Sequence, residues 1–190
     1  MGYTGAMAKV IGSLPRETRR NLLGTMAAAV SPLARQKQEM EEGAGLRWLL
    51  PILEQLPDSV SVFLCPSLGF FGRAECVVAG PGTVLVLATL HWKGMITTGE
   101  NDEWRGAGNT DLGRPDKRAL WFADRLAYGG YADGLHLEPV VVCTGGRAAL
   151  SGLAPLATVV QGEEFSGFLQ QVLSPGGPMP DRVLAVLGGR

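Results

Sequence analysis

A few polar residues near the middle of the chain could do metal-assisted or acid–base chemistry. Glu75 opens one apolar stretch, whereas His91 and Lys93 follow a longer one at 83–90. Residues two apart share one face of a strand, so His91 and Lys93 could flank a site in which Glu75 ligates a metal ion. The acids of the loop sequence "GENDE" at 99–103 could fold back to complete that site. An ordinary solvated turn explains this loop more simply.

Apolar periodicity indicates the elements that must position these residues. Alternating or continuous apolar runs predict strands at 59–68, 74–80, 83–92 and 137–146, and a short fifth strand followed by a helix within 156–173. The run at 83–92 is apolar almost throughout, which indicates burial on both faces. Amphipathic spacing predicts helices at 14–30, 41–58 and 114–130, with Pro51 interrupting the second.

The helix predicted at 114–130 has the clearest boundaries, because Pro115 lies at its start and Asp116 in its first turn. Its apolar residues at helical spacing are Leu120, Trp121, Ala123 and Ala127. The order of elements is a helix, three strands, a helix, a strand, a short strand and a helix. This order predicts an α/β layered domain with a mixed sheet covered by helices.

Composition narrows the functional classes. The chain has 190 residues, of which 46% are hydrophobic and 18% charged, and its net charge is −1. Neither a disordered chain nor a strongly polyionic one has this balance, and the net charge gives no argument for nucleic acid. Cys65, Cys76 and Cys143 are odd in number and lack metal-type spacing, as expected of buried thiols in a reducing compartment. No apolar run has the length of a membrane span, so we expect a soluble cytoplasmic protein.

The stretch "GRAECVVAGPGTVLVLATLHWKGMI", with the later "RPDKRALWFADRLA" and "PVVVCTGG", resembles the nuclease-related domain (NERD) family. The similarity runs from about residue 42 to about residue 172. It rests on the "GPG" turn between two apolar strands, the "WKG" after the third strand and the apolar "PVVV" strand after the helix. The resemblance implies a restriction-endonuclease-like PD-(D/E)xK fold, a three-layer domain with helices on both faces of a mixed sheet. It also implies Mg²⁺-dependent hydrolysis of phosphodiesters by converging carboxylates and a lysine.

The catalytic motif of this family is degenerate here. Glu75 stands where the family has an aspartate, but the acid and the lysine of the third strand are replaced by Ala88 and Leu90. A single carboxylate cannot hold Mg²⁺ in the usual site, so we expect neither catalysis nor a cofactor. If the alignment is right, Ala88 and Leu90 share one face of the third strand near Glu75.

The resemblance also implies where DNA would lie, at the polar end of the sheet. Aromatic and basic residues interleave there in "LHWKG", "EWRG" and "GRPDKR". The basic side chains expected to contact phosphates are Lys93, Arg105, Arg114, Lys117 and Arg118. Such binding would be weak, salt-dependent and independent of DNA sequence.

We divide the chain into a helical N-terminal arm (1–40), a nuclease-related domain (41–173) and a Pro/Gly-rich C-terminal tail (174–190). The preferred function is a degenerate nuclease-like domain that binds DNA or a protein partner, or associates with itself, in DNA maintenance or defence. One alternative is an active Mg²⁺-dependent nuclease with a relocated site around Glu75. The other is a purely structural subunit of a larger complex.

Overall fold

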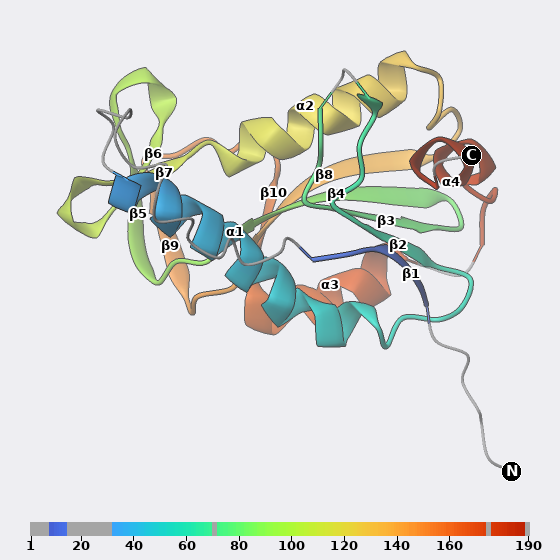
Figure 1. The fold of residues 1–190 in the computed structure, drawn as a ribbon, viewed down its shortest axis with the longest axis horizontal. Coiled ribbons are helices and arrows are strands. Elements are labelled where there is room, and N and C mark those ends of the chain that lie inside the picture. Colours follow the sequence, from blue (N-terminus) through green and yellow to red (C-terminus); the bar gives the residue numbers. More distant parts are fainter. Residues whose placement is uncertain (1–7, 15–31, 70–71, 174–175, 189–190) are drawn as a thin grey trace, which may run out of the picture.

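The computed structural model describes residues 8–14, 32–69, 72–173 and 176–188, so the helix predicted at 14–30 lies almost entirely outside the described residues. Its main feature is a six-stranded mixed sheet in the order β1-β2-β3-β4-β8-β10 (Figure 1). The strands are β1 (Lys9–Gly12), β2 (Ser61–Leu64), β3 (Cys76–Gly80), β4 (Thr83–Leu90), β8 (His136–Cys143) and β10 (Thr158–Gln161). Strands β2, β3 and β4 form an antiparallel meander, whereas β1 pairs with β2, and β8 with β4 and β10, in parallel.

Helices cover both faces of this sheet. They are α1 (Pro32–Leu53), α2 (Pro115–Tyr128), α3 (Phe165–Val172) and α4 (Asp181–Leu187). Helices α1 and α3 pack on one face through a cluster that includes Leu49 and Phe165, and α2 and α4 pack on the other through Phe122 and Val183 (Figure 1). The predicted α/β domain, with helices on both faces of a mixed sheet, is confirmed.

Strand β4 lies at the centre of the sheet. It pairs with β3 on one side and with the whole of β8 on the other, and each of its eight residues is buried. Burial on both faces explains its almost continuous apolar sequence, as predicted. The ends of this strand therefore have little freedom to move.

A second sheet of four strands was not predicted. Its order is β7-β6-β5-β9, from β5 (Gly94–Thr98), β6 (Trp104–Gly106), β7 (Thr110–Gly113) and β9 (Ala148–Ser151). The sequence at 97–114 indicates a polar loop or an irregular hairpin, because these strands are short and bury few side chains. Single inward residues such as Ile96 and Trp104, both almost fully buried, form a small core with Leu90.

Three terminal features also differ from the sequence analysis. Strand β1 lies within the predicted helical arm, and its four residues pair with β2. Helix α1 begins at Pro32 and continues through the predicted boundary at residue 40. Helix α4 lies within the predicted tail, and its Val183 is completely buried against the α2 face of the sheet.

Among the described helices, none combines the length and the apolar character needed to cross a membrane.

Helix α1 approaches β4 very closely at Gly45. A Cβ atom at this position would overlap Oγ1 of Thr89 and lie 2.5 Å from its Cβ. Only glycine leaves room for the Thr89 side chain, so this contact fixes the end of β4 against α1.

Gly45→Ala should therefore destabilise the fold by about 1–3 kcal/mol, because the added methyl group overpacks the contact with Thr89. The measurement is the free energy of unfolding in urea. Gly167→Ala in α3 is the matched control, since a Cβ there meets no atom within 4 Å. It should stabilise by about 0.5–1 kcal/mol through helix propensity alone. Equal stabilisation by both substitutions would contradict the close approach.

Candidate functional site

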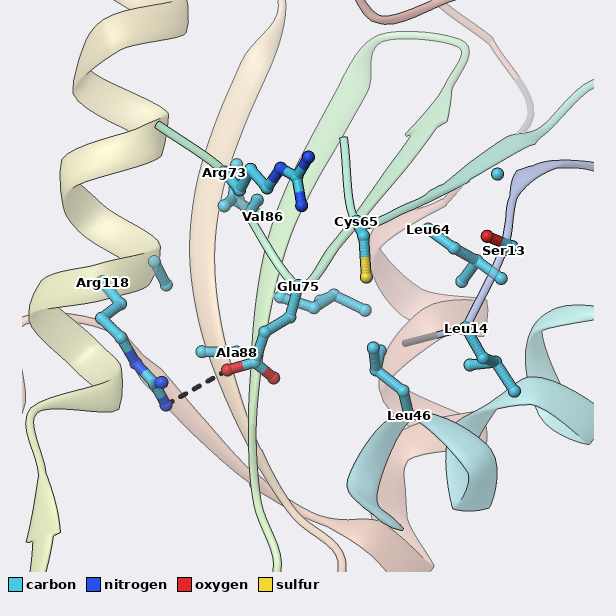
Figure 2. Close-up of a pocket in the computed structure, with 14 residues that line it drawn as sticks. Ser13, Leu14, Leu46, Leu64, Cys65, Arg73, Glu75, Val86, Ala88 and Arg118 are labelled. Atoms are coloured by element: carbon cyan, nitrogen blue, oxygen red, sulfur yellow. Dashed lines mark ion pairs between the residues drawn. The ribbon is translucent and has the colours of Figure 1, made fainter. Parts of the chain in front are cut away.

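A cavity of about 680 Å³ opens between α1 and α2, where β3 begins and β4 ends (Figure 2). Its polar residues include Arg73, Glu75 and Arg118, and its apolar wall includes Leu46 and Ala88. This is the location that the sequence analysis predicted for a degenerate nuclease site. The charged lining residues sum to one positive charge, from two arginines and one glutamate.

The carboxylate of Glu75 is held by two neighbouring elements. Its Oε2 accepts hydrogen bonds from the N–H of Thr89 at 2.6 Å and from Thr89 Oγ1 at 2.8 Å. Its Oε1 lies 3.1 Å from Nη2 of Arg118 on α2 (Figure 2). The pairing of β3 with β4 ends at Cys76 opposite Leu87, and beyond this point the N–H of Thr89 donates to the side chain of Glu75.

The cavity does not fit a Mg²⁺ ion. Ala88 lies beside Glu75, and Glu75 is the only carboxylate that lines the described part of the cavity. Its charge is already balanced by Arg118, whereas Mg²⁺ needs several free oxygen ligands. No group of three or more His, Cys, Asp or Glu residues that could hold a metal ion occurs within the described ranges.

Only one of the two motif positions lies by the cavity. Ala88 and Leu90 share one face of β4, as the alternation of a strand requires, and Ala88 lines the cavity. Leu90 packs instead into the small core with Ile96 and Trp104. Leu90 therefore does not line the cavity, because residues of the second sheet pack against it.

His91 and Lys93 do not join Glu75. Both are exposed beyond the end of β4, where Nδ1 of His91 lies 3.2 Å from Oγ1 of Thr144. The aliphatic part of Lys93 lies over Gly146 in the loop after β8. The structure thus places these two residues beside the β8–β9 connection, and neither lines the cavity.

The five predicted phosphate-contacting residues fall into two groups. Arg105 pairs with Glu103, Arg114 with Asp116 and Arg118 with Glu75. Lys93 and Lys117 are exposed, and neither forms an ion pair with any other described residue.

Sequence reasoning missed Arg73, which lines the cavity, is exposed and has no ion pair among the described residues. The signal was available, because Arg73 precedes Glu75 by two residues and residues at this spacing project to one side of an extended chain. Arg73 therefore brings an unneutralised cation to the cavity.

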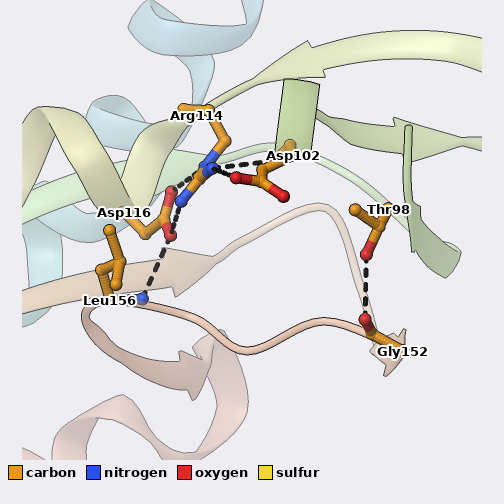
Figure 3. A network of polar contacts seen from close by, with 6 residues as sticks. All are labelled: Thr98, Asp102, Arg114, Asp116, Gly152 and Leu156. Atoms are coloured by element: carbon orange, nitrogen blue, oxygen red, sulfur yellow. Dashed lines mark hydrogen bonds and ion pairs between the residues drawn. The ribbon is translucent and has the colours of Figure 1, made fainter. Parts of the chain in front are cut away.

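A buried ion pair fixes the start of α2. Asp116 is fully buried, and its oxygens lie 2.8 and 2.9 Å from Nε and Nη2 of Arg114 (Figure 3). Arg114 also donates to the carbonyl oxygen of Asp102, and Asp116 accepts from the N–H of Leu156 at 3.1 Å. The pair thus joins α2 to the 100–102 turn of the second sheet and to the loop before β10. Arg114 thus directs its guanidinium into contacts within the chain.

The same contacts set the ionisation of Asp116. Burial alone would raise its pKa, but the hydrogen bonds from Arg114 and from the N–H groups of Leu156 and Lys117 outweigh burial. The pKa of Asp116 is therefore below its ordinary value.

The three cysteines are free and differ in environment. Cys76 and Cys143 are buried in the sheet, and burial raises the pKa of both thiols, that of Cys143 to about 11. Cys65 is half-buried and lines the cavity near Glu75 (Figure 2).

No family model matches the sequence, and comparisons with curated proteins and with solved structures give no match.

Asp116→Asn should lower the free energy of unfolding by about 3 kcal/mol, because it leaves the Arg114 guanidinium without its carboxylate. Asp124→Asn on the same helix is the control, since Asp124 is exposed, and it should change stability by less than about 0.5 kcal/mol. Urea unfolding at pH 7 measures both variants. Equal effects at the two positions would contradict the structural role of the pair.

The stabilisation by Asp116 should also depend on pH. Because its folded pKa is lowered, the contribution is fully present above the unfolded value of about 3.9 and is lost as pH falls through the folded value. The stability difference between the parent and Asp116→Asn should therefore narrow in acid, measured by urea unfolding at a series of pH values. A difference that stays constant down to pH 2 would contradict the lowered pKa.

Proposed function

We propose that this chain is a restriction-endonuclease-like domain that binds DNA without cleaving it. The order α1, β2–β4, α2, β8 around a mixed sheet supports the fold assignment. We place the protein in the cytoplasm, because its three cysteines are free thiols.

The state of Glu75 carries the proposal. In a metal-dependent nuclease, a carboxylate at this position must offer its oxygens to a divalent cation. Here the two oxygens face Thr89 and the guanidinium of Arg118, and the neighbouring motif position is Ala88. Glu75 thus occupies the position of a metal ligand in such a nuclease, but its carboxylate oxygens contact Thr89 and Arg118.

A relocated nuclease site around Glu75 has less support. Asp102 lies 3.9 Å from Nη1 of Arg114, at the start of α2, and Glu100 does not line the cavity. The loop acids that could have completed the site therefore do not converge on Glu75.

Binding would be carried by the cations that the fold leaves unneutralised. Arg73, Lys93, Lys117 and Arg147 are exposed and have no ion pair with another described residue. Arg73 lines the cavity, whereas Lys117 is exposed in the first turn of α2. Contacts between such side chains and phosphates do not depend on base sequence.

The parent protein should not cleave supercoiled, linear duplex or single-stranded DNA in Mg²⁺ or Mn²⁺, measured by gel electrophoresis after prolonged incubation. The physical reason is that one neutralised carboxylate cannot assemble the metal site. Cleavage that disappears in Glu75→Ala would establish the relocated nuclease instead.

Lys117→Glu should weaken DNA binding several-fold on every sequence tested and lower the salt dependence by about one phosphate contact. Filter binding between 25 and about 200 mM salt measures both effects. Lys9→Glu is the matched control. Lys9 is exposed at the first residue of β1, whereas the cavity lies at the other end of this strand, so the substitution should leave binding unchanged. If no DNA is retained even at low salt, a protein partner replaces DNA in this proposal.

A further inference from the structure

The outer face of α2 exposes two large aromatic residues. Trp121 is 42% exposed and Tyr128 is 90% exposed. The two residues are seven positions apart, which places them on the same face of the helix, two turns from each other. The sequence analysis placed Trp121 with the apolar residues of the helix. The face of α2 that is buried instead comprises Ala119, Phe122, Ala123 and Leu126.

The Trp121 ring is held in place by its neighbours. The guanidinium of Arg125 lies 5.2 Å from the ring centroid, one turn along the helix. The ring also rests against Gly72, where a Cβ atom would lie 2.8 Å from Cζ3. An aromatic ring supported in this way is already oriented for a ligand and loses little freedom on binding.

Cations surround this ring. Lys117 precedes Trp121 by four residues and Arg125 follows it by four, so a cation, an aromatic ring and a second cation succeed one another along the helix. The acid on this face of the helix is Asp124, so the charge around the ring is positive.

We propose that single-stranded nucleic acid binds across the outer face of α2, with a base stacked on Trp121 and a phosphate beside Lys117. This inference rests on the proposed DNA binding and names the form of nucleic acid. Every base of a single strand can present its flat face to an aromatic side chain, and nearby cations neutralise the backbone. In a duplex the bases are stacked on one another, so the exposed ring would gain nothing from it.

The test is fluorescence anisotropy with labelled oligo-dT and oligo-U, and with a duplex of the same length, at low salt. The parent should bind the single strands more tightly than the duplex. Trp121→Ala should weaken single-strand binding about tenfold or more, because stacking on one base is lost. Trp121→Phe keeps a ring and should retain most of the affinity.

Trp48→Ala is the matched control. Trp48 is 39% exposed, similar to Trp121, but it lies on α1, across the sheet from α2. This substitution should leave binding unchanged, and the circular dichroism of each variant checks that it folds.

The outcomes separate the two proposals. Tighter binding to single strands that depends on Trp121 supports this inference. Binding to duplex as tight as to single strands, or single-strand binding unaffected by Trp121→Ala, overturns this inference and leaves the proposed DNA binding intact. Failure to bind any of the three probes overturns both.

Discussion

The buried carboxylate of Asp116 is the constraint on which the site depends. A charge without solvent contact is costly unless hydrogen bonds and an opposite charge satisfy it, and here they come from Arg114 and from the N–H of Leu156. Because these groups belong to different segments, satisfying one carboxylate fixes the start of α2 against the second sheet and the loop before β10. The orientation of α2 in turn directs Arg118 toward Glu75 and leaves Trp121 on the outer face.

The cavity shows how a protein can stabilise a half-buried carboxylate. Arg118 supplies one positive charge at 3.1 Å, and Thr89 near the end of β4 supplies two hydrogen bonds. A planar guanidinium suits this task because it is always charged and tolerates partial burial. Arg73 has no ion pair with another described residue, so the described lining carries one net positive charge although the whole chain is slightly acidic.

Long, regular patterns could be predicted from the sequence, and contacts between distant segments could not. Strands β2, β3, β4 and β8 and helix α2 follow from runs of apolar residues at one period. The second sheet escaped prediction because β5 pairs with β9, some fifty residues later, and each strand buries only a few side chains. The same limit explains the site, since alternation placed Ala88 and Leu90 on one face, but the second sheet decided that only Ala88 lines the cavity. Among the predicted phosphate-contacting residues, Arg105, Arg114 and Arg118 form ion pairs. The partners of Arg105 and Arg114 lie two residues away in the sequence, so these two ion pairs are local.

The unequal burial of the three cysteines has a practical consequence. Cys76 and Cys143 are buried thiols whose raised pKa keeps them protonated, and protonated thiols react slowly with electrophiles. Cys65 is the thiol that faces the cavity. A maleimide dye would therefore label the native chain at Cys65 first, without any engineered residue. The protein thus carries its own attachment point for an optical reporter, a few side chains away from Glu75 and Arg73.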